Sequence, residues 1–231
     1  MDEKGWSQFH PKAAEFLDAI PASAVEEAVW MSEETRGYEA MTIPAQVNYV
    51  GKAASLYAAG YRFHGSCHVI SRYLRNAWLW EKVRVQGGAY GAFTLFDRIS
   101  GVLTFVSYRD PNLMRTLEIF DGSAEFLKNL RLSDKELSKS IIGTIGDMDQ
   151  YQLPDAKGYT SLVRHLAGET DVERQRIREE VLATNPSDFT SFGVVLEQAL
   201  NRGETKVLGS ETAIKEALAE RPGWLEVLKV L

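Results

Sequence analysis

Residues 78–108 read WLWEKVRVQGGAYGAFTLFDRISGVLTFVSY, a stretch that joins the end of a helix, a glycine stop and two strands. An apolar stripe leads into it at helical spacing and predicts a helix over residues 65–83. The stripe comprises Val69, Ile70, Tyr73, Leu74, Ala77 and Trp78. Gly87 and Gly88 end this helix, because glycine favours a helix C-terminus and tolerates a tight turn. The stretch therefore predicts a helix followed directly by strands.

The two strands are predicted over residues 89–96 and 102–108, and the glycine-containing linker 97–101 is typical of a hairpin. Alternation predicts an apolar face formed by Phe93, Leu95, Leu103 and Phe105. It predicts a smaller and more polar face formed by Tyr90, Ala92 and Thr94. A sheet of this kind packs helices on its apolar face and leaves the other face open.

The chain beyond the hairpin is predicted to be mainly helical. Helix starts are indicated by N-caps with a following proline and by capping boxes. These starts are Asp110-Pro111, Ser133–Glu136, Thr170–Glu173 and Asn185-Pro186. A short strand is predicted over residues 205–208 and a last helix over residues 211–219.

The chain before residue 65 mixes helix and strand signals. A helix is predicted over residues 11–20, and strands over residues 26–31 and 38–50, with Pro44 breaking the second strand or placing it at an edge. Strands early and helices late predict an α+β fold, a single two-layer domain whose mixed or antiparallel sheet carries helices on one face. No linker-like segment divides residues 1–231, so we expect one domain.

The composition is that of an ordinary globular protein, with 45% apolar and 25% charged residues in 231. The net charge of −6 and the lack of a basic patch argue against a nucleic-acid partner. No apolar run approaches the roughly 18 residues of a membrane span. Cys67 is the single cysteine, so no intrachain disulfide can form and a reducing compartment is expected. Residues 1–4 resemble neither a signal peptide nor a transit peptide. This predicts either a cytosolic protein or a piece of a longer protein whose targeting signal lies elsewhere.

His64, Cys67 and His68 could share one helix face and bind a transition metal, since the histidines are four residues apart. No carboxylate lies between them, so local hydrogen bonding at a helix N-terminus is the favoured interpretation. Cys67 and His68 could also act as nucleophile and base. Neighbours on a helix point about 100° apart, so a buried, inert cysteine is favoured.

Arg84 and Tyr90 flank the glycine turn, and both side chains can donate to a carbonyl or anionic oxygen. Such a pair suits stabilisation of a transition-state oxygen or a grip on a peptide backbone. A surface arginine and a half-exposed tyrosine are the alternative. Gly87 and Gly88 follow a helix, the wrong order for a phosphate loop. They form either a C-cap with a tight turn or a place where a substrate backbone comes close.

Four segments in the same order resemble the carboxy-terminal region of the presequence proteases, members of the pitrilysin/insulinase superfamily of zinc peptidases. The segments are Pro44–Ala54, Trp78–Gly91, Ser107–Leu113 and Ile141–Tyr159. The resemblance is strongest over residues 43–180. It implies a peptidase of four α+β domains in two halves, which close around an unfolded peptide. It also implies that the last domain supplies an arginine and a tyrosine near the scissile bond, and Arg84 and Tyr90 match that pair.

The zinc motif of this superfamily, His-x-x-Glu-His, lies in the amino-terminal half and does not occur in this sequence. The resemblance therefore implies that residues 1–231 are the fourth, non-zinc domain, with no metal site or cofactor of its own. The implied partners are an unfolded peptide, which Gly87 and Gly88 help to bind, and the amino-terminal catalytic half. The parent is expected in a mitochondrial or plastid matrix, or in the cytoplasm of a prokaryote, and the chain alone is expected to cleave nothing. The alternative is a non-catalytic structural or peptide-binding subunit of the same superfamily.

Overall fold

The computed structural model describes residues 2–22, 26, 29 and 37–229. It contains two compact units, one formed by Arg36–Gln150 with Glu169–Leu231 and one by Met1–Thr35 with Tyr151–Gly168. Each unit is described by itself, and the single domain over the whole chain stays a prediction. The strand predicted over residues 26–31 lies largely outside the described residues.

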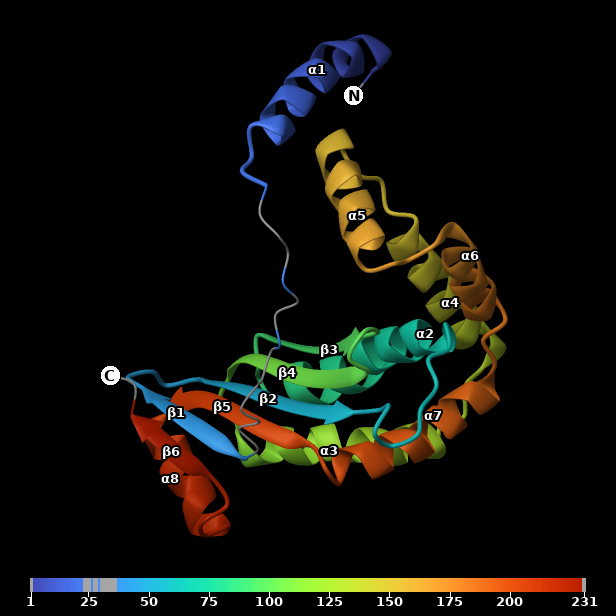
Figure 1. Cartoon of the computed structure of the whole chain (residues 1–231). Helices are drawn as coiled ribbons and strands as arrows, with labels where there is room; N and C mark the ends of the chain where they lie inside the picture. The colour runs from blue at the N-terminus through green and yellow to red at the C-terminus, as the bar shows by residue number, and fades with distance from the viewer. Residues whose placement is uncertain (1, 23–25, 27–28, 30–36, 230–231) are drawn as a thin grey trace. The chain divides into compact units, whose positions relative to one another are not determined.

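The larger unit is built on a six-stranded sheet in the order β3-β4-β2-β5-β1-β6 (Figure 1). Its strands are β1 (Glu39–Ile43), β2 (Asn48–Ser55), β3 (Gly91–Asp97), β4 (Val102–Asp110), β5 (Glu204–Ser210) and β6 (Glu226–Lys229). β1 pairs in parallel with β5 and β6, and the other pairings are antiparallel, so the sheet is mixed. The predicted α+β fold with a mixed sheet is confirmed. The break near Pro44 is confirmed as well, since β1 and β2 are separate strands with β5 between them.

The larger unit also contains seven helical segments among its described residues. They are α2 (Ser66–Tyr73), η1 (Leu74–Val85), α3 (Met114–Lys128), α4 (Asp134–Met148), α6 (Asp171–Leu182), α7 (Pro186–Leu200) and α8 (Glu211–Glu220). The smaller unit holds α1 (Glu3–Asp18) and α5 (Pro154–Leu166). The side chains of Ser133, Thr170 and Asn185 cap α4, α6 and α7 as predicted, because each accepts a backbone N–H of the first helical turn.

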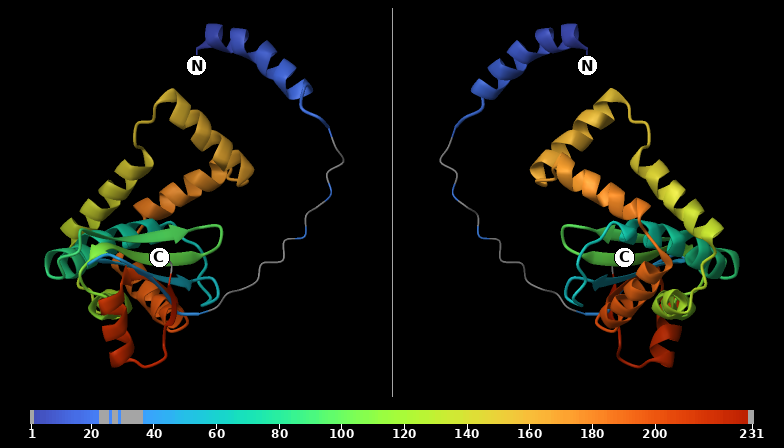
Figure 2. Two further views of the ribbon diagram at one scale, coloured as in Figure 1. Left: turned by 90° about the vertical axis from the view of Figure 1, so that its left-hand side faces the viewer. Right: turned by 90° about the vertical axis from the view of Figure 1, so that its right-hand side faces the viewer.

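One face of the sheet is covered by helices, and α3 and α7 run along that side in both figures (Figures 1 and 2). The core lies there, with Phe105 of β4 stacked on Phe120 of α3 at 5.3 Å between ring centroids. The opposite face is called the open face below, and its side chains Phe93 and Leu95 of β3 are exposed. The predicted arrangement of helices on one face is therefore confirmed.

The predicted faces of the first hairpin strand are wrong. Ala92 and Thr94 are buried, whereas Phe93 and Leu95 are exposed on the open face. Asp97 faces Val102 across the hairpin, so each odd-numbered residue of β3 faces an even-numbered residue of β4. A linker one residue longer would have reversed this relation, because a one-residue change in register moves every side chain to the other face. The prediction for Leu103 and Phe105 is correct, and both are buried.

The predicted helix over residues 65–83 is two kinds of helix joined end to end. The buried positions Cys67 and Ile70 of α2 and Leu74 directly after it follow α-helical spacing. From Leu74 the chain continues as the π-helix η1, and the next buried side chains are Leu79 and Val83. The step of five residues from Leu74 to Leu79 follows from the wider turn of a π-helix, whose hydrogen bonds join residues five apart instead of four. The predicted stripe is confirmed at Trp78, which is partly buried and packs against the core, whereas Ala77 is only partly buried and the fully buried positions of this segment are Leu79 and Val83.

The predicted N-cap at Asp110 is also wrong, because Asp110 is the last residue of β4 and α3 begins at Met114. The Asp110 carboxylate instead accepts hydrogen bonds from the Asn112 N–H at 2.9 Å and the Thr116 hydroxyl at 2.7 Å. Aspartate often bonds the backbone two residues ahead, and this local turn competes with capping a helix.

Candidate functional site

Arg84 lies in the last turn of η1, and its guanidinium stacks on the ring of Trp80. The Cζ atom is 3.9 Å from the ring centroid, and the arginine side chain is partly buried. Among the described residues no carboxylate forms an ion pair with Arg84. Its in-plane N–H groups are therefore available to an oxygen from outside the chain.

The turn between the two candidate residues is closed by backbone hydrogen bonds. The Gly88 N–H donates to the Arg84 carbonyl at 3.0 Å, and the Ala89 N–H donates to the Val83 carbonyl at 3.2 Å. Gly88 has a φ of +81°, and a Cβ on Gly87 would collide with the Val83 carbonyl oxygen. The Asn112 side chain donates to the Gly87 carbonyl at 2.6 Å. Both glycines are thus required by the helix C-cap and the tight turn.

Tyr90 follows this turn directly and is 69% exposed. Its N–H donates to the Tyr108 carbonyl at 3.1 Å, which joins the turn to the end of β4. Its ring lies 5.7 Å from the Tyr108 ring, edge to face, and Tyr108 lies 5.4 Å from Tyr49 in the same manner. Edge-to-face aromatic pairs are mutually attractive and hold each ring in place.

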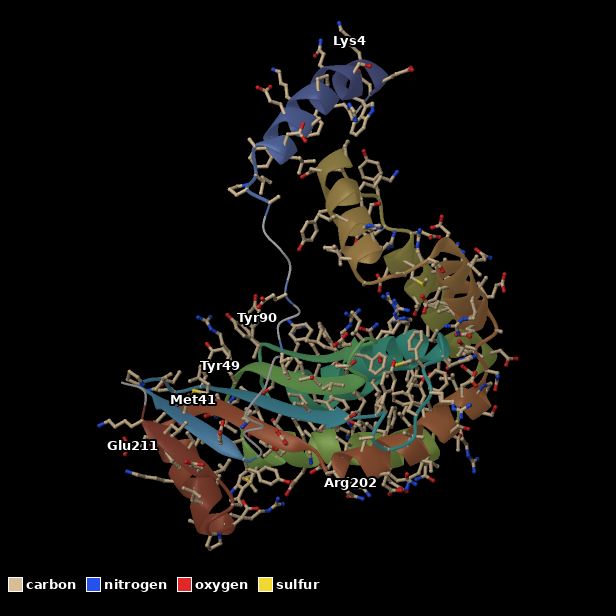
Figure 3. The ribbon with its side chains drawn as sticks, in the orientation of Figure 1. Lys4, Met41, Tyr49, Tyr90, Arg202 and Glu211 are labelled. Carbon is tan, nitrogen blue, oxygen red and sulfur yellow. The ribbon has the colours of Figure 1, made fainter. Side chains whose placement is uncertain are left out.

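These tyrosines begin a row of side chains on the open face. Across the strands Tyr49 faces Leu208, and Leu208 faces Met41. Figure 3 shows Met41, Tyr49 and Tyr90 on one side of the sheet. The open face is therefore apolar along this row, with the Tyr90 hydroxyl at one end.

The sequence analysis identified Arg84 and Tyr90 but missed Tyr49, Tyr108 and Arg109. Arg109 is exposed and has a φ of +48°, a conformation that is uncommon for a residue with a side chain. Its guanidinium lies 5.9 Å from the Tyr108 ring. Alternation in β4 could have placed Tyr108 opposite Ser107, on the open face, but no sequence signal identifies the turned backbone of Arg109.

The three residues considered for metal binding are engaged locally. The His64 ring Nδ1 lies 2.8 Å from the Ser66 hydroxyl, and Cys67 is fully buried as predicted. Burial raises the pKa of the Cys67 thiol to about 12, which disfavours the thiolate that a metal or a nucleophile needs. Burial, with the nearby Arg98 charge, lowers the pKa of His68. In the part of the chain that the structure describes, no three histidine, cysteine or carboxylate side chains gather as metal ligands would.

None of the helices among the described residues is both long enough and apolar enough to cross a bilayer.

A family model described as "PreP C-terminal domain" matches residues 38–212. The chain is 48% identical over 231 residues to presequence protease 1, chloroplastic/mitochondrial, of Arabidopsis thaliana, covering all of this chain and 21% of that protein. It is 31% identical over 214 residues to Protein HypA of Clostridium perfringens, covering 93% of this chain and 22% of that protein. The chain thus spans about a fifth of the length of these curated relatives.

The fold is similar to that of pitrilysin. The crystal structure of pitrilysin matches with a TM-score of 0.62 at 14% sequence identity, over 99% of this chain and 25% of that one. At this identity the likeness shows a shared fold alone.

Proposed function

Since this chain belongs to the family of PreP C-terminal domains, we propose that it forms the substrate-facing last domain of a presequence-protease-like zinc metallopeptidase that degrades unstructured peptides. The zinc chemistry is proposed to reside in the amino-terminal half of that enzyme. The described residues do not fit a zinc site, because no set of three ligands gathers and Cys67 is held as a buried thiol. The role of this chain is therefore to bind the peptide and to stabilise charge on it.

The observation that carries the proposal is the placement of Arg84 and Tyr90 on either side of one rigid turn. The turn is closed by backbone hydrogen bonds, and among the described residues the Arg84 and Tyr90 side chains have only aromatic contacts, so their donors are open to a peptide oxygen. A peptide carbonyl oxygen gains negative charge when a nucleophile attacks its carbon. Preorganised N–H and O–H donors lower the energy of that state more than the energy of the ground state.

Gly87 and Gly88 would lie against the backbone of the bound peptide. Gly88 is exposed and has no side chain, so an extended backbone could pass close to the turn. The apolar row that runs from Tyr90 through Tyr108 and Tyr49 is available to the side chains of the same peptide. Unfolded peptides expose apolar side chains, which matches a partner of this kind.

The proposed partners are an unfolded peptide and the amino-terminal catalytic half of the same protease. The proposed location of the parent protein is an organelle matrix, supported by the chloroplastic and mitochondrial relative that is 48% identical. A non-catalytic, peptide-binding subunit is the alternative that the experiment below must separate.

The test is a chimera in which this chain replaces the matching fifth of the Arabidopsis thaliana presequence protease 1. We expect the chimera to cleave an unstructured fluorogenic peptide. Arg84→Ala and Tyr90→Phe should each lower kcat by about 10²–10³-fold, the usual loss for one oxyanion donor. The matched control is Tyr38→Phe, since Tyr38 is 42% exposed and packs on Trp224 next to β1 and β6, at the edge of the sheet opposite β3. Unchanged kcat in both site variants would refute these residue roles. A folded chimera that binds the peptide without cleaving it would favour the non-catalytic subunit.

A further inference from the structure

Trp80 is a half-exposed tryptophan whose ring covers a guanidinium. Its side chain is 50% exposed, and the Arg84 Cζ atom lies 3.9 Å from its centroid. The three other cation–aromatic pairs among the described residues are wider, at 5.8 to 5.9 Å. Trp80 and Arg84 are therefore in direct stacking contact, which is the geometry that attracts a guanidinium to an indole face.

The packing of the domain does not account for Trp80. Trp78, two residues earlier, stacks on Phe126 at 4.7 Å and donates its Nε1–H to the Ile119 carbonyl at 2.9 Å. Trp80 has no such hydrogen bond among the described residues, and Arg84 is its stacking partner. The buried residues of η1 are Leu74, Leu79 and Val83, so Trp80 projects away from the core side.

Arg84 is also held differently from other arginines of the larger unit. Arg98 bonds Glu173 at 2.6 Å, Arg178 bonds Asp149 at 2.6 Å, and Arg72 bonds Asp147. A carboxylate partner occupies the N–H groups of the guanidinium, whereas an aromatic face contacts only its flat surface. Stacking therefore fixes the guanidinium and leaves its donors open.

The nearest carboxylate along the helix is also engaged elsewhere. Glu81 precedes Arg84 by three residues and is the carboxylate of η1 nearest to it in sequence. Its carboxylate instead accepts a hydrogen bond from the Gln86 side chain at 2.8 Å. The Arg84 backbone is fixed in turn, because its carbonyl accepts the Gly88 N–H and Val83 beside it is buried.

We infer that Trp80 is a positioning residue that holds the Arg84 guanidinium extended, with its donors free for a substrate oxygen. The inference rests on the proposed function, in which Arg84 meets the peptide. Trp80 contributes no donor to the substrate itself. The stacking restricts the Arg84 side chain before the substrate binds. Less conformational entropy is then lost when Arg84 binds the transition state.

A measurement on the isolated chain tests the stacking without any catalysis. The ring current of Trp80 should move the side-chain proton resonances of Arg84 upfield in NMR spectra, with assignment by their loss in Arg84→Lys. Trp80→Ala should return them to the values of a free arginine, and Trp80→Phe should keep part of the shift. Trp6→Ala is the control, since Trp6 is 54% exposed and carries no guanidinium among the described residues. Arg84 resonances that do not change in Trp80→Ala would overturn the inference.

Kinetics of the chimera described above test the consequence. Trp80→Ala should lower kcat by about 5-fold with a smaller change in KM, in line with the strength of an exposed cation–π pair. Trp80→Phe should recover most of that loss. Trp80→Ala should cost nothing further when Arg84 is already alanine, because coupled residues are not additive.

The two proposals fail in different ways. If Arg84→Ala leaves kcat unchanged, the proposed catalytic role of Arg84 fails, while the NMR result still decides whether Trp80 holds it. If Arg84→Ala lowers kcat and Trp80→Ala does not, the positioning role is refuted and the proposed function stands. An equal loss of kcat from Trp80→Ala in the presence and absence of the Arg84 side chain would also refute it.

Discussion

Asp110 is a fully buried carboxylate at the end of β4, and it connects the candidate site to α3. Its oxygens accept from Asn112 and Thr116, and Asn112 in turn donates to the carbonyl of Gly87. The glycine turn between Arg84 and Tyr90 is thus supported from behind by groups that Asp110 orients. A buried network of this kind is rigid when every group is satisfied.

Asp110→Ala is expected to lower the free energy of unfolding by about 1–3 kcal/mol, because it leaves buried donors without an acceptor. The matched control is Asp121→Ala, which removes a half-exposed ion pair with Lys52 and should cost about 0–1 kcal/mol. Urea unfolding followed by circular dichroism measures both. Equal effects of the two substitutions would contradict the structural role of Asp110.

His68 is expected to make the free energy of unfolding depend on pH near neutrality. Burial is the main cause that lowers its pKa below the usual value of 6.5, and the Arg98 charge adds to it. Below about pH 6.5 the unfolded chain binds a proton that the folded chain does not, so stability falls as the pH falls. The free energy of unfolding should be lower at about pH 5 than at about pH 7. His68→Gln should reduce this difference, and an undiminished pH dependence in that variant would refute the assignment.

At the scale of elements, η1 and the turn after it decide where Arg84 and Tyr90 lie. The π-helix turns the buried side toward Leu79 and Val83, and this leaves Trp80 and Arg84 on the exposed side. π-helical segments are rare in proteins, and those that occur often lie at functional sites. The position of η1 directly before the candidate site agrees with this.

Glycine substitutions test the turn as an element. Gly88→Ala should lower the free energy of unfolding by about 1 kcal/mol because its φ of +81° strains a side chain. Gly87→Ala should cost more, since its Cβ would collide with a backbone carbonyl. Gly146→Ala is the control in α4, where the Cβ meets open space, and it should stabilise by about 0.5–1 kcal/mol. The three melting curves are compared directly. Stabilisation by Gly88→Ala would contradict the left-handed turn.

At the scale of the whole molecule, the sheet separates two different surfaces. One face carries the core beneath α3 and α7, and the open face carries exposed apolar side chains such as Phe93, Leu95 and Tyr108. Exposed apolar side chains that share one face are typical of an interaction site. The peptide of the proposed function would meet this side of the domain.

The chain taken by itself is expected to neither bind catalytic zinc nor cleave peptides. The described residues bring no three metal ligands together, and the sequence has no His-x-x-Glu-His. Isothermal titration with zinc chloride should give no heat of specific binding, and the untagged chain should leave the fluorogenic peptide intact. Metal-dependent cleavage that disappears in Arg84→Ala would overturn this expectation.

Much of this protein follows from local sequence alone. The capping residues Ser133, Thr170 and Asn185 start their helices where the sequence places them, because a side chain that accepts a backbone N–H acts over only three residues. The strand break near Pro44 follows from the missing backbone N–H of proline, and the hairpin follows from its short glycine-containing linker. The placement of Arg84 and Tyr90 at the two ends of one glycine turn follows from local sequence as well, since only five residues, two of them glycines, lie between them, whereas their shared role stays a prediction.

Other features were decided by tertiary structure. The faces of Phe93 and Thr94 depend on the hairpin register, which follows from contacts with β4 and α2, and Thr94 donates to the carbonyl of Ser71 in α2. Residues 74–85 form a π-helix because of the side chains that the core buries, Leu74, Leu79 and Val83. Sequence periodicity alone does not distinguish a π-helix from an α-helix in this segment. The row from Tyr90 to Met41 joins strands far apart in sequence. Local interactions determine where elements begin and end, whereas burial against distant segments determines which side of each element faces the core and which faces the proposed substrate.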